Sequence, residues 1–521
     1  MNNIIKKYRL KYFAVFFAAF AFFSFLQSAP VMPDPDGFYH AKTTLLISEQ
    51  GIPQNFPFLQ FTTLKDNYID HHLIYHLILI PFVKFFNPLI GVKFAQSILA
   101  AIFITVFYWF LKKEKVKLAP LWIILLAANS PFIFRVSLIK ANSISLIILF
   151  VGLYAIFNHK HLLLLIVSYL YVLSYGGWPL ILICVLIFIT SDYLFKKIKL
   201  KTVWQKLKIN LLSSNKKQSN LKLLFSCFTG LLFGLIINPY FPKNLKFYYE
   251  QIVQIGIINL QDKIGVGGEW YPYKPLELLS SSGLAAIFFL ISAVIFFISL
   301  KKQNGKSLSL LIMALFFFTI TLKSRRYVEY LIPFAIAFSA VAAARGLNSK
   351  NAKEFYFLLQ KFYRKKTKCT ATLIIFFISA SAFLITRDIY KTKQELSVGS
   401  NLTLYKNAAE YIKKNSDSGD IIFHADWDDF PALFYYNSKN YYLVGLDPTF
   451  MYNYDTNLYN QWAKITTGEG GEDLYNKITK KFNAKFVFLD NEHTAFNNYL
   501  FINPNFQLAY SDDEAKVYKI K

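Results

Sequence analysis

FAQSILAAIFITVFYWFL at residues 94–111, followed at once by KKEKVK at 112–117, shows the pattern that decides the fold. The 18 uncharged residues of the first stretch are close to the roughly 20 that a helix needs to cross the hydrocarbon core of a bilayer. The lysines that follow are typical of a cytoplasmic loop, where Lys and Arg accumulate. Apolar runs of this kind, separated by charged breaks, recur along most of the chain.

The composition places the whole chain in the membrane class. Of its 521 residues, 55% are hydrophobic and only 17% are charged, and the mean hydropathy is +0.34. Soluble domains contain about 45–50% apolar and about 25% charged residues. The sequence therefore predicts a polytopic α-helical membrane protein.

The net charge of +26 is unevenly distributed. From Arg387 to the end there are 15 Lys+Arg against 18 Asp+Glu, a net of −3, so the rest of the chain has 42 against 13, a net of +29. These excess basic residues lie in short loops between apolar runs, as the positive-inside rule describes. We therefore expect them to contact anionic lipid headgroups and expect no nucleic-acid partner.

Alternation of apolar runs and basic breaks predicts eleven transmembrane helices, with the N-terminus cytoplasmic. The first, at about 12–29, is interpreted as a retained anchor. We expect the apolar stretch Leu73–Phe86 to lie at the outer interface, because it is short and contains His76, Pro81 and Lys84. Expected outer breaks are 30–72, 135–140, 176–178, 239–275 and 323–326, and expected inner breaks are 112–117, 159–161, 196–222, 301–306 and 345–368.

The domain division follows from this topology. Residues 1–387 form the predicted transmembrane domain, with a first outer loop at 30–72 and a flexible outer loop at 239–275. Residues 388–521 form an extracytoplasmic α/β domain of common size. Its expected strands are Asp420–His424, Tyr441–Val444, Lys485–Leu489 and Ala515–Ile520.

The first polar cluster on the predicted outer face is DPDGFYHAK at 34–42. Asp34 and Asp36 stand two residues apart in a Pro-Gly turn and can face one point. Carboxylate oxygens suit Mg²⁺ or Mn²⁺. An Asx turn at the end of a helix explains the same pattern, and the sequence alone leaves both interpretations open.

Two further clusters each contain a glutamate. GVGGEWYPY at 265–273 places Glu269 in a glycine-rich loop that can complete a site when substrate arrives; an interfacial aromatic belt is the alternative. RRYVEY at 325–330 places Arg325 and Arg326 at the outer end of a helix with Glu329 one turn inside it. An arginine pair is suited to holding a phosphate, and a charge within a membrane helix usually faces a cavity.

The last cluster is DWDDFP at 426–431, in a strand-to-helix turn of the predicted α/β domain. Its acids and Trp427 can bind a polar ligand, or Asp428 or Asp429 can cap the following helix. The eight histidines show no zinc-binding spacing. His71, His72 and His76 are the only close set.

The order of these clusters resembles the catalytic subunit of oligosaccharyltransferase, a membrane glycosyltransferase of the C fold (GT-C). DGFYHAK at 36–42 fits the family pattern D-[PG]-[YF]-x-[NH]-x-[RK], which implies that Asp36 binds a metal. EWYP at 269–272 resembles an E-x-x-P motif, which gives Glu269 a role in the metal and acceptor site. Arg326 stands seven residues before Pro333, as does the family arginine that contacts the donor diphosphate.

The resemblance is incomplete at two places. The family has a D-x-[DE]-like motif seven residues after an arginine, whereas here Arg135 leads to Asn142. One metal ligand is therefore missing, or Asp34 or Asn142 replaces it. The family W-W-D-Y-G motif matches only at Trp427 and Asp428, the predicted acceptor contacts.

The resemblance implies transfer of a sugar or oligosaccharide from a polyprenyl-(di)phosphate donor to a protein or glycan acceptor at the outer face of a bacterial- or archaeal-type inner membrane. Asp36 and Glu269 are the predicted catalytic residues and, with Asp34, hold a divalent Mg²⁺ or Mn²⁺. Arg326 and Arg325 bind the donor phosphate, and Arg135 with Asn142 forms a second-loop contact. The alternatives are a lipid or surface-polysaccharide acceptor, a transporter and a non-catalytic scaffold.

Overall fold

The computed structural model describes residues 2–202, 210–347, 367–471 and 473–521. The chain divides into two compact units. The helical unit comprises Met1–Ala29, Gln96–Gly234 and Glu269–Ser397, and the mixed unit comprises Pro30–Ala95, Leu235–Gly268 and Val398–Lys521. Parts of two predicted inner loops, 203–209 and 348–366, lie outside the described residues.

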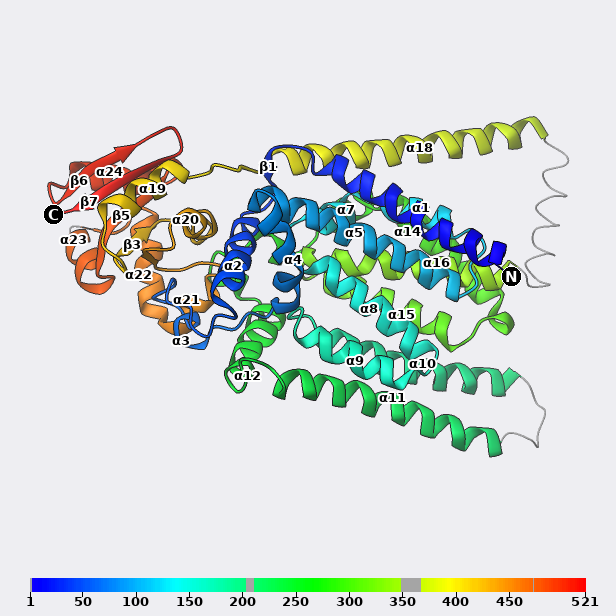
Figure 1. The fold of residues 1–521 in the computed structure, drawn as a ribbon. Helices are drawn as coiled ribbons and strands as arrows, with labels where there is room; N and C mark the ends of the chain where they lie inside the picture. Colours follow the sequence, from blue (N-terminus) through cyan, green and yellow to red (C-terminus); the bar gives the residue numbers. More distant parts are fainter. Residues whose placement is uncertain (1, 203–209, 348–366, 472) are drawn as a thin grey trace. The chain divides into compact units, whose positions relative to one another are not determined.

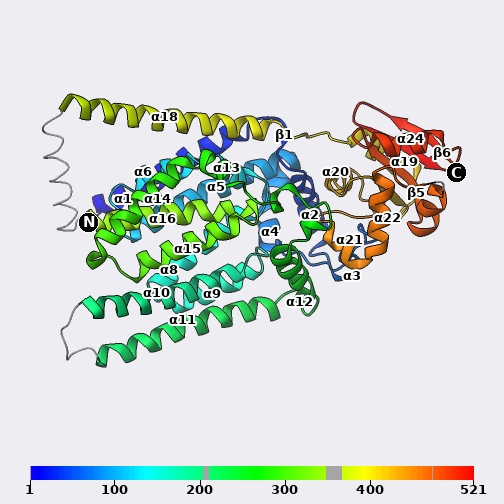
Figure 2. The same cartoon turned by 180° about the vertical axis from the view of Figure 1, so that it is seen from behind.

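The helical unit is a bundle of long helices that run side by side, with α11 and α18 on opposite sides of it in both views (Figures 1 and 2). Short 3-10 segments η3 (Gly268–Trp270), η4 (Leu300–Lys302) and η5 (Arg325–Tyr327) join some of them. The helices are α1 (Asn2–Leu26), α5 (Pro88–Lys113), α6 (Ala119–Ala127), α7 (Ser130–Ser137), α8 (Asn142–Phe157), α9 (His161–Val172), α10 (Pro179–Thr202), α11 (Asn210–Ile236), α13 (Pro275–Ser281), α14 (Gly283–Ile298), α15 (Gly305–Thr321), α16 (Val328–Gly346) and α18 (Thr367–Ser397).

Each of the eleven ranges predicted to span the membrane is helical. Within the described residues, four helices are long and apolar enough to cross a bilayer, or up to six if two bent pairs each count as one span. The bent pairs are α6 with α7, at 79°, and α13 with α14, at 91°. Shorter apolar helices occupy most of the other predicted spans, so the number eleven stays a prediction.

The bend between α6 and α7 has a local cause. Pro131 lies in the first turn of α7, where its missing N–H and fixed φ are tolerated. The residue at the break, Asn129, has an extended backbone, with φ −112° and ψ 105°. A new helix, α7, begins after this break, and Arg135 lies in its last turn.

The central helix α16 is buried along almost its whole length and has an ionic group at each end. Near its start, Glu329 pairs with Arg135, and near its end Arg345 pairs with Glu114, which also binds Lys306. A helix of 19 residues is about 28 Å long, close to the roughly 30 Å of a bilayer's hydrocarbon core. Glu329 and Arg345 are 16 residues apart, about 24 Å along the helix axis.

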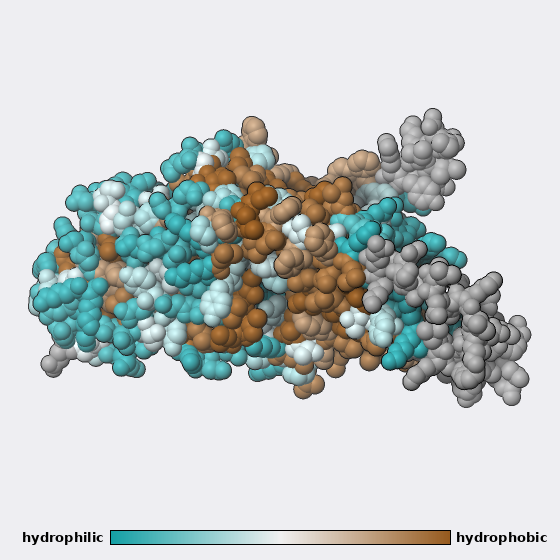
Figure 3. All heavy atoms as spheres, turned by 90° about the horizontal axis from the view of Figure 1, so that it is seen from below, coloured by the Kyte–Doolittle hydropathy of each residue, from teal (hydrophilic) through white to brown (hydrophobic). Residues whose placement is uncertain are grey.

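Apolar side chains gather on the surface of the helical bundle, as the face in Figure 3 shows. In water, an apolar surface of this extent would be a liability, whereas it suits contact with lipid. Exposed examples are Phe17, Phe225, Leu290, Phe297 and Phe376.

The mixed unit is built on a five-stranded sheet of order β4-β3-β5-β7-β6. The first three strands are parallel and the last two antiparallel to their neighbours. The strands are β3 (Ile421–His424), β4 (Tyr441–Tyr442), β5 (Ala484–Asp490), β6 (Phe506–Ser511) and β7 (Ala515–Ile520). Around the sheet lie α19 (Lys406–Asn415), η6 (Trp427–Asp429), α20 (Phe430–Tyr436), α21 (Thr449–Tyr454), α22 (Thr456–Thr466), α23 (Leu474–Asn476), the π-helical η7 (Lys477–Lys481) and α24 (Thr494–Ile502).

Segments from the two predicted outer loops belong to this mixed unit, where the first loop contacts both the C-terminal part of the chain and the second loop. β1 (Val31–Met32) pairs with β2 (Ser400–Asn401), and the Tyr442 N–H donates to the Phe58 carbonyl at 2.7 Å. From the second loop, the Glu250 carboxylate accepts a 2.8 Å hydrogen bond from Thr63. All three segments must therefore lie on one side of any membrane. The loop elements are α2 (Asp36–Gln50), α3 (Leu64–Asn67), α4 (Leu73–Phe85), α12 (Lys243–Tyr248), the π-helical η1 (Tyr249–Ile258) and the 3-10 segment η2 (Leu260–Asp262).

The four predicted strands are present, with β4 shorter than expected, and one further strand was missed. β6 lies at the edge of the sheet and buries only Phe506 fully, so its sequence lacks the alternation that marks a half-buried strand. The predicted domain boundary at 388 falls inside α18, which continues to Ser397. The helix at α4 has 13 residues, fewer than a span needs, and packs against α2.

His424 at the end of β3 gives the mixed unit a pH-dependent stability. Its Nε2 accepts hydrogen bonds from the Leu443 and Val444 N–H groups, at 3.2 and 3.4 Å, and its Nδ1 donates to the Asp426 carbonyl at 2.7 Å. This arrangement requires the neutral ring. Burial lowers the pKa of His424 from 6.5 to about 4, against a smaller raising effect of the Asp426 carbonyl.

We predict that the mixed unit loses stability as the pH falls from 6.5 toward 4. In that window the unfolded chain binds a proton that the folded state excludes, at a cost approaching about 3 kcal/mol. Hydrogen exchange of the Leu443 and Val444 amides in the full-length protein, corrected for intrinsic rates, measures the loss. His424→Gln should reduce the change of the opening free energy between pH 6.5 and pH 4. An unchanged pH dependence contradicts the assignment of the effect to His424.

Candidate functional site

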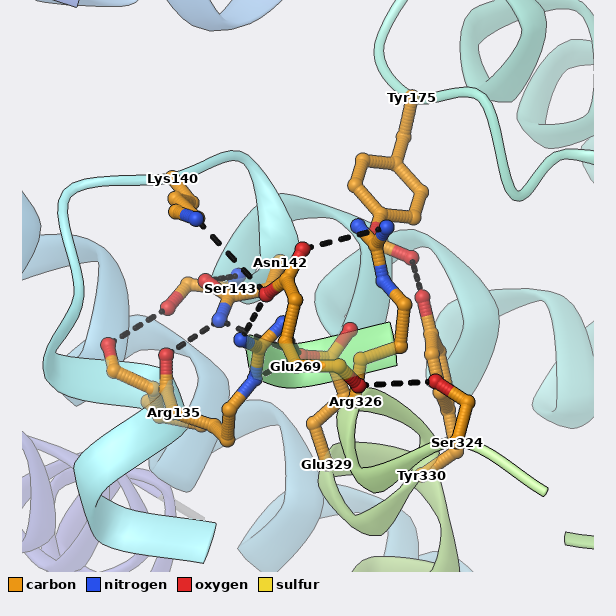
Figure 4. Close-up of polar contacts among 12 residues, drawn as sticks. Arg135, Lys140, Asn142, Ser143, Tyr175, Glu269, Ser324, Arg326, Glu329 and Tyr330 are labelled. Carbon is orange, nitrogen blue, oxygen red and sulfur yellow. Dashed lines mark hydrogen bonds and ion pairs between the residues drawn. The ribbon is translucent and has the colours of Figure 1, made fainter. Parts of the chain in front are cut away.

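The Glu269 carboxylate lies among three cationic side chains of the helical unit (Figure 4). Its Oε2 accepts a hydrogen bond from Arg135 Nη1 and lies 3.7 Å from Lys140 Nζ. Its Oε1 lies 3.4 Å from Arg326 Nη1. We call Arg135, Lys140 and Arg326 the cationic cluster.

Arg326 is held from three directions. Besides Glu269, its Nη2 donates to the Tyr175 hydroxyl at 3.0 Å, and its guanidinium carbon lies 4.3 Å from the centroid of the Trp270 ring. A guanidinium over an indole face is a favourable cation–π contact. These contacts fix the plane of the guanidinium.

Arg135 is anchored from beneath by Glu329, which has no exposed surface. Arg135 Nε and Nη2 both approach Glu329 Oε2, at 3.0 and 2.9 Å. Asn142 donates to the Arg135 carbonyl, and its Nδ2 lies 3.5 Å from the same Glu329 oxygen. Arg135 and Asn142 thus contact each other within the helical unit, and their predicted role as second-loop contacts of the site stays a prediction.

The loop that carries Glu269 is attached to the segment that leads into α16. Ser324 Oγ donates to the Glu269 carbonyl at 2.9 Å, and the Arg325 N–H donates to the Tyr271 carbonyl at 3.0 Å. This backbone docking places the side chain of Glu269 beside Arg326, 57 residues later in the sequence.

The charges explain the protonation state of Glu269. Burial raises the pKa of its carboxyl, but Arg326, Lys140 and Arg135 together outweigh burial and hold the pKa well below the ordinary value. Glu269 is therefore ionised at neutral pH. With Glu329, the group has three positive and two negative side chains, a net of +1.

Arg325, predicted with Arg326 to bind the donor phosphate, faces different partners. Its Nη2 lies 3.6 Å from Glu277 Oε2, its Nε donates to the Pro272 carbonyl at 3.2 Å, and its guanidinium lies 5.5 Å from the Tyr273 ring centroid. Its partners among the described residues are thus on the side of Glu277, and its phosphate role stays a prediction.

Asp34 and Asp36 belong to the mixed unit, whereas Glu269 and Arg326 belong to the helical unit. Asp34 Oδ1 accepts a hydrogen bond from the Asp36 N–H at 3.0 Å, which is the Asx turn that the sequence offered as an alternative. Asp36 begins α2, where a negative charge suits the positive end of the helix dipole. Their joint role with Glu269 stays a prediction.

The metal predicted from the resemblance needs free oxygen donors. Both Glu269 oxygens contact cations, so in this arrangement Glu269 fits an ion-pair partner and not a ligand of Mg²⁺ or Mn²⁺. Across the described ranges, no three His, Cys, Asp or Glu side chains are grouped as a metal site. Asp34 and Asp36 keep their predicted metal role, and no step below passes through a metal.

The cluster around Trp427 in the mixed unit serves the local fold. Asp426 caps the 3-10 segment η6: its side chain accepts from the Asp428 N–H at 3.0 Å, and Asp429 completes the capping box. Asp429 occupies the N-cap position of the following helix α20, as predicted, but its side chain makes no capping hydrogen bond to that helix. Burial, with Asp490 and Asp426, raises the pKa of Asp429 well above its ordinary value. Acceptor binding by Trp427 and Asp428 stays a prediction.

A buried chain of two histidines and an acid was missed by the sequence analysis. His76 Nδ1 lies 2.7 Å from Asp70 Oδ2, and His76 Nε2 lies 2.8 Å from His40 Nδ1. All three residues are at most 4% exposed. They tie α2, which begins at Asp36, to α4. The sequence signal was the set His71, His72 and His76, but His40 comes from another helix.

The fold is that of the GT-C membrane glycosyltransferases, because each solved structure compared below has this fold and matches nearly the whole chain. No family model and no curated protein matches the sequence. The similarity lies in three-dimensional structure alone.

Three solved structures show this similarity. Archaeal oligosaccharyltransferase AglB from Archaeoglobus fulgidus, in complex with an inhibitory peptide and a dolichol-phosphate, matches 99% of this chain and 74% of its own, with 14% identity and a TM-score of 0.62. ArnT from Cupriavidus metallidurans, bound to undecaprenyl phosphate, matches 98% of both chains, with 13% identity and a TM-score of 0.52. Arabinofuranosyltransferase AftD from Mycobacteria matches 98% of this chain but 40% of its own, with 8% identity and a TM-score of 0.54.

We predict that Glu329→Gln destabilises the protein. Removing one partner of a buried ion pair costs about 3–5 kcal/mol, and we expect the lower end because Arg135 keeps Glu269. The matched control is Glu277→Gln, since Glu277 is 43% exposed and pairs with Arg325 at 3.6 Å; exposed pairs contribute about 0–1 kcal/mol. Thermal unfolding in detergent compares the variants, and equal changes in Tm contradict the anchoring role of Glu329.

Proposed function

We propose that this protein is a membrane glycosyltransferase that transfers a sugar or oligosaccharide from a polyprenyl-phosphate or polyprenyl-diphosphate donor at the outer face of a bacterial or archaeal inner membrane. The observation that carries the proposal is the cationic cluster, built into a unit of the GT-C type. Positive charge in a membrane protein otherwise gathers on the cytoplasmic side, so three cations around one point require an anionic partner.

The similar structures support a phosphate lipid as that partner. The AglB structure contains a dolichol-phosphate and the ArnT structure contains undecaprenyl phosphate. A lipid-linked donor also matches the apolar surface of the bundle, along which a polyprenyl chain can lie. An anionic headgroup is then left for Arg326 and Arg135, whose planar guanidinium groups suit phosphate oxygens.

The proposed reaction is a displacement at the anomeric carbon of the sugar. An acceptor oxygen or nitrogen forms a bond to this carbon, the bond from the carbon to the donor phosphate oxygen breaks, and the acceptor proton passes to a base. Negative charge grows on the departing phosphate. Arg326 and Arg135 stabilise that charge because their orientation is already fixed by Trp270, Tyr175 and Glu329.

Asp36 is the proposed base or orienting group for the acceptor. As the first residue of α2, it projects from the segment that the His40–His76–Asp70 chain ties to α4. The acceptor itself is a protein, a glycan or a lipid. The AglB structure contains a peptide, so a protein acceptor is the first to test. Only Trp427 and Asp428 match the family acceptor motif, so glycan and lipid acceptors are tested beside it.

We predict that Asp36→Ala abolishes transfer in reconstituted vesicles and that Arg326→Ala lowers kcat by about 10²–10³, as for loss of one charge-stabilising donor. Arg325→Ala should cost less, because Arg325 faces Glu277. Glu277→Gln serves as the control. Mass spectrometry of proteins, glycans and lipids after incubation with a lipid-linked sugar identifies the acceptor, and full activity of Asp36→Ala rejects its assignment.

A divalent metal held by Asp34 and Asp36 is a separate proposal. Bound there, Mg²⁺ or Mn²⁺ would supply positive charge that stabilises a phosphate. We predict that treatment with a chelator removes transfer activity and that Mg²⁺ or Mn²⁺ restores it. Activity that survives chelation at unchanged rate rejects the metal and leaves the cationic cluster as the source of charge stabilisation.

A further inference from the structure

The cationic cluster already contains an anion, the Glu269 carboxylate. Its two oxygens take different partners: Oε2 contacts Arg135 and Lys140, and Oε1 contacts Arg326. A phosphate group bound between the same cations would use the same donors, since carboxylate and phosphate oxygens both accept from guanidinium forks. Both anions cannot fill one position.

We infer that Glu269 is an internal competitor for the donor phosphate, and that the phosphate displaces its carboxylate from Arg135, Lys140 and Arg326. This inference rests on the proposed function and deepens it. It adds Lys140 to the phosphate ligands and gives Glu269 a role opposite to metal binding.

The charges agree with an exchange of one anion for another. With Glu269 in place the group carries +1, and with Glu269 withdrawn Arg135, Lys140 and Arg326 face only Glu329, a net of +2. A phosphate monoester, the group that leaves after transfer from a monophosphate donor, carries about two negative charges near neutral pH. Withdrawal of Glu269 therefore gives the site a net charge equal in size and opposite in sign to that of the product phosphate.

Of the two carboxylates, Glu269 is the one placed to move. Its side chain is 22% exposed and lies in the three-residue segment η3, whereas Glu329 has no exposed side-chain surface and lies inside α16. A Cβ added at the preceding residue, Gly268, would meet no described atom within 4 Å. Glu329 can therefore hold Arg135 in position while Glu269 leaves.

Binding in detergent micelles, followed by native mass spectrometry without transfer, tests the inference. The probes are undecaprenyl phosphate, undecaprenyl diphosphate and the uncharged alcohol undecaprenol. Glu269→Gln should bind the phosphate lipids about tenfold more tightly than the unsubstituted protein, as expected if the competent state is populated about one part in ten. Glu269→Gln should gain more affinity for one of the two phosphate lipids, and that lipid, monophosphate or diphosphate, identifies the donor class.

Glu277→Gln is the matched control, because it also removes one negative charge from the partner of an arginine, the neighbouring Arg325, and leaves the contacts of Arg135 intact. A competitor predicts tighter binding only for Glu269→Gln, so equal gains in both variants reveal a general charge effect and overturn the inference. Weaker binding by Glu269→Gln also overturns it, since Glu269 would then assist the donor. If the unsubstituted protein prefers neither phosphate lipid to undecaprenol, the proposed function itself fails. Glu269→Asp keeps the negative charge and should therefore bind the phosphate lipids no more tightly than the unsubstituted protein.

Discussion

A carboxylate among three cations is the interaction on which the chemistry of this protein depends. Arg135 lies at the end of α7 and Lys140 in the bend five residues later, whereas Arg326 comes from a 3-10 segment far along the sequence. Mutual repulsion would separate the three without an anion between them. Glu269 supplies that anion. The same requirement makes the position a site for a phosphate, because any ligand that replaces Glu269 must carry negative charge.

Around this interaction, the helical unit provides rigidity. Glu329 holds Arg135 from the first turn of α16, and Tyr330 of the same turn shares Ser145 with Tyr171, both hydroxyls at 2.7 Å from the Ser145 oxygen. The far end of α16 is fixed by Arg345 and Glu114. The ionic groups at its two ends therefore fix the register of α16 against the neighbouring segments.

Sequence patterns predicted the class of fold well, because length and hydropathy of a span are local properties. The boundaries of β7 and the arginine at 326 followed from such local signals. The His40–His76–Asp70 chain did not, since it joins α2 to α4, and tertiary pairing leaves no spacing to detect. Glu329 was recognised as a costly intramembrane charge, yet its partner, Arg135, was identifiable only once the bend at Asn129 placed α7 beside α16. Lys140 was counted as a topological marker and not as a ligand.

A structure of the full chain with undecaprenyl phosphate bound in a lipid nanodisc tests the central claim most directly. The account predicts phosphate oxygens within hydrogen-bonding distance of the Arg135 and Arg326 guanidinium groups, near Lys140, with the Glu269 carboxylate withdrawn from all three. A phosphate bound elsewhere, with Glu269 still paired to both arginines, would contradict it.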